Sequence, residues 1–275
     1  LNMTPGILLA PGWSENALVS AGLQAKTSHI NGVFNCVCIV DIDSSTAGAT
    51  KYDDVKRQKE KQAVTSANCY AVWLYAKVGD VIYAGSAMAA AATVATDANN
   101  GDIPNVSPDN KPISISAACL KDGTEVLLDQ EQANVVNSFG VATWLNMNGF
   151  RLWGNNTACY PGNTDPKDRW FSVRRFMSWD DNTFIQTYFK KVDDPLNKRL
   201  IEALVDSENV RGNSFVSRGI CARHEIQYIE SENPTTSLLN GCITFHKYLS
   251  PFNPAEDIEE LVEFDPNAIF DALGG

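Results

Sequence analysis

Three short, nearly continuous apolar runs mark the first part of the chain, at residues 6–10, 33–40 and 69–76. Runs of this length without polar alternation are typical of strands covered on both faces, as in a parallel sheet. Three segments that separate or follow them are predicted to be helical: 14–25 with Ser14 as its cap, the charged surface segment 52–64, and 84–98 with its small residues. This order of strands and helices predicts a doubly wound α/β unit over residues 1–140.

Residues 99–124 break this pattern, because Asn, Asp, Gly, Pro and Ser dominate them. Their composition predicts a long surface loop within the first unit. A helix over 129–139 is expected next, and it should end at Gly140, since glycine is a common helix stop. Strands over 141–146 and 150–153 are expected to follow the helix.

The remaining residues, 141–275, are predicted to form a separate, two-layered α+β domain that ends in an arm over 251–275. Its expected elements, in chain order, are a helix over 170–192 that Asp180-Asp181-Asn182 could interrupt, a helix opened by Asp194-Pro195, strands over 220–229, 243–249 and 258–264, and a short helix opened by Asp265-Pro266.

The chain is acidic, with a formal net charge of −11 over 275 residues. A surface of this sign disfavours binding to nucleic acid and to anionic lipid, so neither is expected as a partner. The most apolar stretch, residues 84–95, is shorter than the about 20 residues that a bilayer-spanning helix needs. The seven cysteines are scattered and odd in number, which indicates reduced thiols and no disulfide framework.

Asp41 and Asp43 are the best candidates for catalysis, since they follow a buried strand and residues two apart point the same way. Two carboxylates so placed could hold Mg²⁺, and a magnesium-dependent phosphoryl-transfer enzyme on a doubly wound fold is the alternative function. The phosphate-binding glycine loop and lysine of such enzymes are not evident nearby. A polar strand end without chemistry is therefore the favoured interpretation.

Two groups of cysteine and histidine have the residue types of a metal site. Cys36 and Cys38 share one face of a strand, but no further ligand has a convincing spacing. The second group is Cys221, His224, Cys242 and His246. Because Cys221 and His224 are three apart, they point to opposite faces of a regular strand, and at most three of the four could converge without a bulge. Core packing is favoured for both groups, and no metal or cofactor is predicted.

The most informative stretch is residues 149–157, which reads Gly-Phe-Arg-Leu-Trp-Gly-Asn-Asn-Thr. A tryptophan with an arginine two residues before it and turn-forming residues after it suits a half-buried strand that ends in a tight turn. In the form G-x-R-x-W-G-N-x-T, the stretch resembles the signature of contractile phage tail sheath proteins. The resemblance rests on Arg151, Trp153, Gly154, Asn155 and Thr157.

Further segments resemble the same family in the same order. They are the strand and turn at 6–12, the proline loop at 107–113, the pair Arg174-Arg175, and the C-terminal segments 233–246 and 251–264. The resemblance runs from residue 6 to the end, while the family's N-terminal portion is absent from this sequence. It extends alike to the sheaths of phages, prophages and tailocins, and it equates the two predicted units with the family's middle and C-terminal domains.

The resemblance implies a structural subunit without an active site or cofactor. Family subunits form stacked hexameric rings around a tail tube, and their contraction drives the tube through the host envelope. The implied partners are other copies of the chain, the tube protein, and baseplate and tail terminator proteins. Terminal arms add a strand to a neighbour's sheet, a role that would fall here to Ile258, Leu261, Val262 and Phe264. The implied location is the virion tail, assembled in the cytoplasm of the host bacterium.

Overall fold

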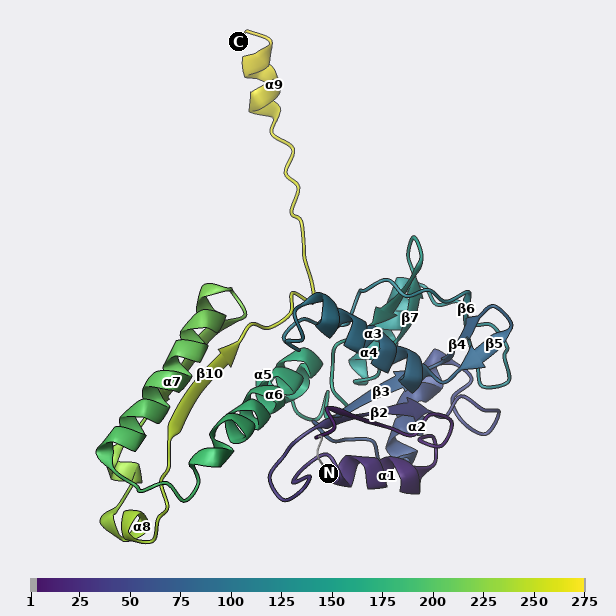
Figure 1. Ribbon diagram of the computed structural model, residues 1–275. Helices are drawn as coiled ribbons and strands as arrows, with labels where there is room; N and C mark the ends of the chain where they lie inside the picture. The colour runs from purple at the N-terminus through teal and green to yellow at the C-terminus, as the bar shows by residue number, and fades with distance from the viewer. Residues whose placement is uncertain (1–3, 275) are drawn as a thin grey trace.

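The computed structural model describes residues 4–274, which form a larger α/β part, a smaller α+β part and an extended C-terminal arm (Figure 1). The larger part is built on three parallel strands in the order β1-β2-β3: β1 (Ile7–Leu9), β2 (Val37–Ile42) and β3 (Cys69–Trp73). The middle strand, β2, is buried along its whole length, as the apolar run before Asp41 predicts. The strand extends beyond that run, so Asp41 lies within it and does not follow it. The prediction of a mixed α/β protein is confirmed at this level.

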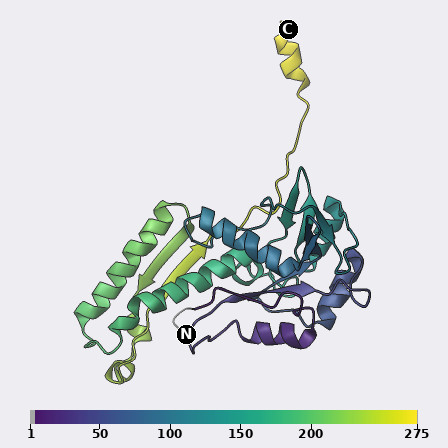
Figure 2. The same ribbon diagram turned by 45° about the vertical axis from the view of Figure 1, so that its right-hand side comes forward.

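Helices lie on both sides of this sheet. Helix α3 (Gly85–Asn99) covers one side and α1 (Ala17–Ala25) the other, in both views (Figure 1, Figure 2). The small residues of α3 allow a close approach, since a Cβ on Gly85 would lie 2.3 Å from the Leu74 carbonyl oxygen. The other helices of this part are η1 (Tyr52–Asp54), α2 (Val55–Lys61) and α4 (Gln130–Ser138).

The predicted strand over 69–76 is two strands in two sheets. Leu74 has a φ of +85°, which turns the chain out of β3 into β4 (Tyr75–Val78). Strand β4 is the middle of a small antiparallel sheet with β5 (Val81–Tyr83) and β6 (Ala117–Cys119). The predicted loop over 99–124 therefore contains a strand. The hairpin β7 (Thr143–Asn146) and β8 (Phe150–Trp153) follows α4, as predicted.

The smaller part packs two long helices against a two-stranded antiparallel sheet. The helices are α6 (Phe171–Tyr188) and α7 (Lys198–Ser217), and the strands are β9 (Cys221–Gln227) and β10 (His246–Pro251). Short elements complete it: α5 (Pro166–Arg169), η2 (Phe189–Lys191), η3 (Glu230–Glu232) and α8 (Thr235–Leu239). No helix in the described part of the chain is long and apolar enough to cross a bilayer.

Four helix predictions from the sequence were wrong in detail. Asn16, and not Ser14, caps α1, because the Ser14 hydroxyl is buried against Asp41. Asn197 caps α7, three residues after the predicted start. The polar run at 180–182 does not interrupt α6, because Asp180 faces other buried charges there. Segment 52–64 is shorter than predicted, and Lys59 in it is buried.

The core crosses the predicted domain boundary. One cluster of buried residues extends from Val37 in β2 to Phe171 at the start of α6. A second cluster consists of Ile103, Phe176, Phe215, Ile220 and Cys221. A third, small cluster consists of Tyr75, Ala84 and Cys119. The residues just after 140 belong to the first cluster, and Ile103 from the first predicted unit belongs to the second. The division at 140 stays a prediction, and the packing favours a later boundary.

Candidate functional site

The signature stretch lies where the two parts and the arm meet, on β8 and the turn after it. The guanidinium of Arg151 donates to the Asn110 carbonyl oxygen at 2.9 Å, which fixes the proline loop on β8. The indole N–H of Trp153 donates to the side chain of Asn134 on α4 at 2.9 Å. Both long side chains therefore connect neighbouring segments and do not point at a ligand.

Gly154 occupies a position that no other residue fits. Its φ is +126°, and a Cβ there would lie 2.5 Å from Asn137 Oδ1. The N–H of Gly154 donates to Asp109 Oδ1 at 2.8 Å, and its carbonyl accepts a hydrogen bond from the Tyr70 hydroxyl. Burial raises the pKa of the Asp109 carboxyl, and the Gly154 and Asn110 N–H groups oppose that shift.

The turn continues to the start of α6. The side-chain NH2 of Asn155 donates to Ser172 Oγ at 3.1 Å. The backbone carbonyl of Asn155 accepts from the Phe171 N–H at 2.8 Å. The Thr157 hydroxyl donates to the Asp168 carbonyl at 2.7 Å. The signature residues are thus brought together as a junction, and their role in the family stays a prediction.

Two polar residues of this junction, Asn156 and Arg169, were not among the site residues predicted from the sequence. Asn156 stands at the variable position of the G-N-x-T pattern, and its Oδ1 accepts from Arg169 Nε at 2.7 Å. Arg169 also lies 2.5 Å from Glu256, a residue of the arm. The junction lines a cleft of about 690 Å³ whose other wall includes residues 254–258.

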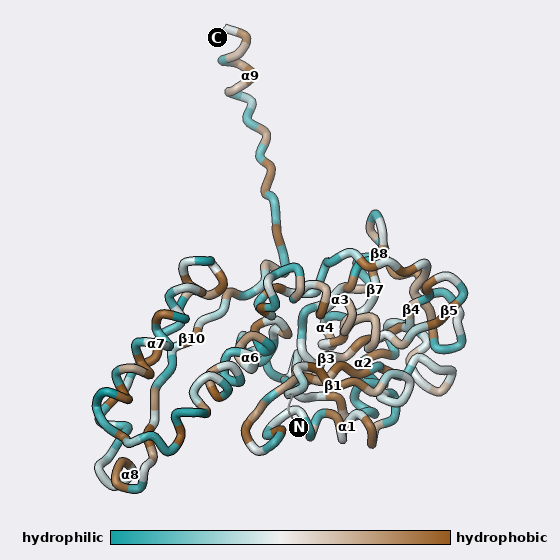
Figure 3. The backbone as a smooth tube through the Cα atoms, viewed as in Figure 1, coloured by the Kyte–Doolittle hydropathy of each residue, from teal (hydrophilic) through white to brown (hydrophobic). Residues whose placement is uncertain are grey.

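The arm leaves the body after β10 and packs on nothing beyond its first residues (Figure 1). Its apolar side chains are open to solvent, with Leu261 94% exposed and Ile258 87% exposed. Hydrophobic and hydrophilic residues alternate along it (Figure 3). The predicted strand over 258–264 is not a strand here, since it lacks a partner in the described chain. The terminal helix α9 (Pro266–Ala272), capped by Asp265, is confirmed; Gly275 lies outside the described residues.

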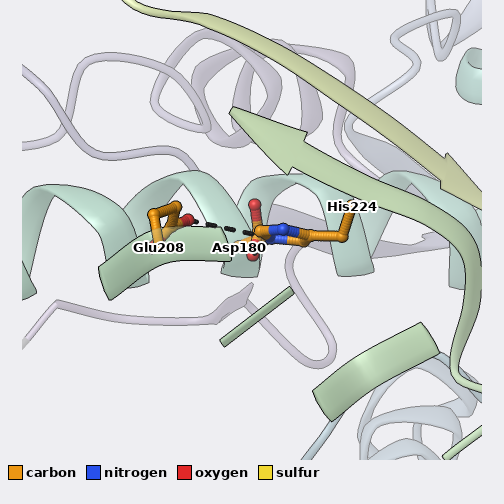
Figure 4. A group of neighbouring side chains, drawn as sticks. All are labelled: Asp180, Glu208 and His224. Carbon is orange, nitrogen blue, oxygen red and sulfur yellow. Dashed lines mark hydrogen bonds and ion pairs between the residues drawn. The ribbon is translucent and has the colours of Figure 1, made fainter. Parts of the chain in front are cut away.

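A buried cluster of charges joins the helices and the sheet of the smaller part. Asp180 on α6, Glu208 on α7 and His224 on β9 converge there, as Figure 4 shows, with His224 Nε2 2.9 Å from Asp180 Oδ1. Arg211 Nη2 lies 2.7 Å from Asp180 Oδ1, and Lys247 Nζ lies 2.8 Å from Asp180 Oδ2. The approach of α7 to β9 depends on Gly212, where a Cβ would lie 2.3 Å from His224 Nδ1.

Asp180, Glu208 and His224 have the residue types and the convergence of a metal site. The two carboxylates are, however, already neutralised by Arg211 and Lys247, which occupy the oxygen lone pairs that a metal ion would need. A divalent ion would have to displace both cations from a buried place. The donor set therefore fits a structural ion-pair network, which we call the charge network.

The other candidates from the sequence are structural. The Asp41 carboxylate accepts hydrogen bonds from Ser14 Oγ and from the N–H and hydroxyl of Ser86, at 2.6–2.8 Å. It caps α3, and none of its oxygens is directed at a ligand. Asp43 Oδ1 accepts from the Ser45 N–H within the next loop. The two carboxylates, weighed as an alternative magnesium pair, are each held by hydrogen bonds within the protein.

The cysteine groups do not converge either. Burial raises the pKa of the Cys36 thiol to about 12, as expected for a core thiol without a metal. In the second group, Cys242 is exposed and His246 Nδ1 lies 3.0 Å from Glu232. With a register shift near Pro251, both Cys221 and His224 are buried, but Cys221 does not belong to the cluster that His224 forms with Asp180 and Glu208. Core packing, the favoured interpretation, holds for Cys36, Cys38 and Cys221.

The fold is that of a mixed α/β protein, and the side chains of the junction connect its segments to one another. Within the described residues, the candidate groups do not assemble into a catalytic site. No protein-family model matches the chain. The major tail sheath protein of Serratia phage KSP20 is 28% identical over 151 residues, which are 54% of this chain and 37% of that protein. A putative prophage major tail sheath protein of Pseudomonas aeruginosa strain UCBPP-PA14 is 23% identical over 95% of this chain and 65% of that protein.

Solved structures share the fold. The sheath of the PVC extracellular contractile injection system in its contracted state gives a TM-score of 0.77 at 17% identity, over 97% of this chain and 72% of that one. The contracted helical sheath of the anti-feeding prophage gives 0.72 at 17% identity, over 94% and 69%. The chain is thus similar in sequence to phage tail sheath proteins and in fold to the sheaths of contractile injection systems, as the signature predicted. The matched proteins are named as tail sheath proteins, which supports the non-enzymatic prediction over the phosphoryl-transfer alternative.

The chain spans less than two thirds of the length of the curated relatives given above.

Proposed function

We propose that this chain is a subunit of a contractile tail sheath, which polymerises around a tail tube and contracts to drive the tube through a host envelope. The observation that carries the proposal is the arm, which presents large apolar side chains to solvent with no place for them on its own body. An isolated chain gains nothing from such exposure, whereas a polymer can bury it between copies. The relatedness to tail sheath proteins supports the same role.

The arm would act by adding a strand to a neighbouring copy. Strands β9 and β10 form a two-stranded sheet, and within the described chain its outer edges lack further partners. A strand over 258–264 would place Ile258, Val262 and Phe264 on one face, since side chains alternate. Interleaved glutamates would keep the unpaired segment soluble before assembly.

The energies favour many weak links over one strong link. Burying an exposed large apolar side chain contributes about 1.5–3 kcal/mol, so three on one face contribute roughly 4.5–9 kcal/mol. Ordering each of seven residues costs about 1–2 kcal/mol of backbone entropy, which main-chain hydrogen bonds only partly offset. One arm would therefore bind weakly, and closed rings, hexameric by the resemblance, would gain strength from linked contacts.

Contraction would slide the folded parts past one another as nearly rigid bodies while the strand links hold. If each subunit buries a few hundred Å² of additional apolar surface, the contracted state gains roughly 5–10 kcal/mol per subunit. Burial of this kind gives a negative heat-capacity change on contraction, which calorimetry of assembled particles at several temperatures would measure. An unchanged heat capacity would contradict this driving force.

The finer assignments belong to the same proposal. The partners are other copies, the tail tube, and baseplate and tail terminator proteins, and the location is the virion tail, assembled in the host cytoplasm. The larger part, with helices on both faces of a parallel sheet, is interpreted as the family's doubly wound middle domain. The smaller part is interpreted as its two-layered C-terminal domain.

Deletion of residues 258–275 from the full-length protein tests the role of the arm. We expect the deletion to abolish tubes in negative-stain electron microscopy, while the circular dichroism spectrum remains that of a folded protein. The matched control is Leu127→Ser, which removes a side chain of similar exposure, 75%, from the body. Tubes of normal length from the deleted protein would refute the assignment of the arm as the link.

A further inference from the structure

One acidic side chain holds the root of the arm on the body. Among the described residues, Glu256 supplies the only side-chain hydrogen bonds and ion pair between the arm and the rest of the chain. Its carboxylate lies 2.5 Å from Arg169 Nη2 and 3.4 Å from Asn156 Nδ2. Both partners belong to the junction around the signature turn, so beyond Pro251 the side-chain attachment of the arm is to the junction.

Arg169 is held in place before the arm reaches it. Its guanidinium lies between two aromatic rings, 4.3 Å from the Tyr160 centroid and 4.0 Å from the Trp170 centroid. Its Nε donates to Asn156 Oδ1 at 2.7 Å, which leaves Nη2 directed at Glu256. A guanidinium fixed in this way loses little further entropy on binding a carboxylate.

This restraint distinguishes the pair from an ordinary surface ion pair. Exposed pairs between two mobile side chains contribute little, because both must be ordered. Here only Glu256, whose side chain is 47% exposed, has to be ordered, while Arg169 is 21% exposed. The planar guanidinium also matches the geometry of a carboxylate better than an ammonium does.

We propose that Asn156 and Arg169 form a socket for Glu256, and that this socket fixes the point from which the arm departs toward a second copy of the chain. The importance of that point for assembly rests on the proposed function, whereas the socket itself is a property of the single chain. The proposal assigns a task to Asn156, which the signature pattern leaves as a variable position.

The socket shortens the free reach of the arm. From the end of β10 at Pro251 to Ile258 there are seven residues, which could span about 23 Å at about 3.3 Å per residue. From Glu256 to Ile258 there are two, which span about 7 Å. The sheet edge that receives the arm must then lie close to the mouth of the junction cleft. The surface around the signature turn becomes the side of the subunit that faces the receiving copy.

Limited digestion with chymotrypsin tests the socket on the chain as it exists. Phe252 lies before Glu256 and Phe264 lies after it, so cleavage at Phe252 reports release of the root and cleavage at Phe264 provides an internal reference. When local opening is fast, the cleavage rate follows the population of the open form. Fragments 253–275 and 265–275 are distinguished by mass spectrometry.

We expect Glu256→Gln to raise the initial rate at Phe252 about fivefold relative to Phe264, since the charge that holds the root is lost. Arg169→Lys should give a smaller rise, because it keeps the charge and loses the planar fork. Glu259→Gln, a change at an exposed arm residue, is the control and should leave the ratio unchanged. Unchanged tryptophan fluorescence would show that each variant remains folded.

An unchanged Phe252-to-Phe264 ratio in Glu256→Gln would overturn the socket, and so would an equal rise in Glu259→Gln. The failure of the socket can be told from failure of the proposed function. Digestion is measured on the single chain, whereas tube formation is measured on the full-length protein. A variant that frees the root but still forms normal tubes would keep the socket and refute its role in placing the receiving copy.

Discussion

Asp180→Asn is the change that most directly tests why the smaller part holds together. Asp180 lies on α6 and contacts three groups from three other elements: Arg211 on α7, His224 on β9 and Lys247 on β10. Asparagine keeps the size of the side chain, removes its charge and replaces one acceptor oxygen by an NH2 donor. The partly buried Arg211 and Lys247 would then keep Glu208 as the ion-pair partner that they share.

The expected loss in the free energy of unfolding can be estimated in two ways, from the pKa of Asp180 and from the cost of breaking a buried ion pair. Burial alone would raise the pKa of Asp180, but the hydrogen bond with His224 and the charges of Lys247 and Arg211 outweigh burial and lower this pKa to about 2. A carboxyl with an ordinary pKa of about 3.9 then contributes about 2–3 kcal/mol at neutral pH. Removing one partner of a buried ion pair costs about 3–5 kcal/mol. We therefore expect a loss of about 3 kcal/mol in the free energy of unfolding.

Urea unfolding followed by tryptophan fluorescence would measure this loss. Trp179 lies in the smaller part, with its ring centroid 5.9 Å from that of Phe215, and it reports on the affected core. Glu202→Gln on α7 is the matched control. Glu202 forms a solvent-exposed ion pair with Lys198 on the same helix, at 3.6 Å. That control should cost less than about 0.5 kcal/mol.

A double variant, Asp180→Asn with Lys247→Met, measures how strongly the two charges depend on each other for their contribution to the free energy of unfolding. Removing both charges should cost less than the sum of the single changes, because neither leaves the other unpaired. A loss below about 1 kcal/mol for Asp180→Asn alone, or additive losses in the pair, would refute the reasoning that the charge network acts as one unit.

Two further predictions concern acid and the signature turn. Because the folded-state pKa of Asp180 is lowered, its stabilisation is present above about pH 4 and is lost as the pH falls towards 2, so acid titration of Asp180→Asn should give a flatter stability profile. Gly154→Ala should cost about 1–3 kcal/mol more in urea unfolding than Gly149→Ala, because both glycines have positive φ but only Gly154 lacks room for a Cβ. Equal costs would contradict the steric argument.

Elements that local pattern determines were predictable. Small residues at helical spacing over 84–98 indicated α3, and Asp265-Pro266 indicated the start of α9. The break at Leu74 was not predictable, because a leucine at positive φ follows from the packing of two sheets and has no local signal. The caps of α1 and α7 were misplaced for a related reason, since several polar residues compete and tertiary contacts choose among them.

Some residues of the junction could be predicted from the sequence and others could not. A distinctive turn made Arg151, Trp153 and Gly154 recognisable, since each meets a steric or hydrogen-bonding demand at a fixed place. Asn156 and Glu256 were missed, because they are 100 residues apart and their contact exists only in the folded chain. The charge network was missed in the same way: its members come from four elements, and no spacing connects them.

The strand predicted over 258–264 was correct as a pattern and wrong as a structure of the single chain. Strand formation is a property of pairs, since main-chain hydrogen bonds come from a neighbour. The segment mixes apolar and acidic residues, and as a strand it would place Ile258, Val262 and Phe264 together on one face, for which its own body offers no partner. The conformation of the arm would therefore be decided by whatever sheet receives it. The same composition explains both the exposure of the apolar side chains in the free chain and the strand expected in the polymer.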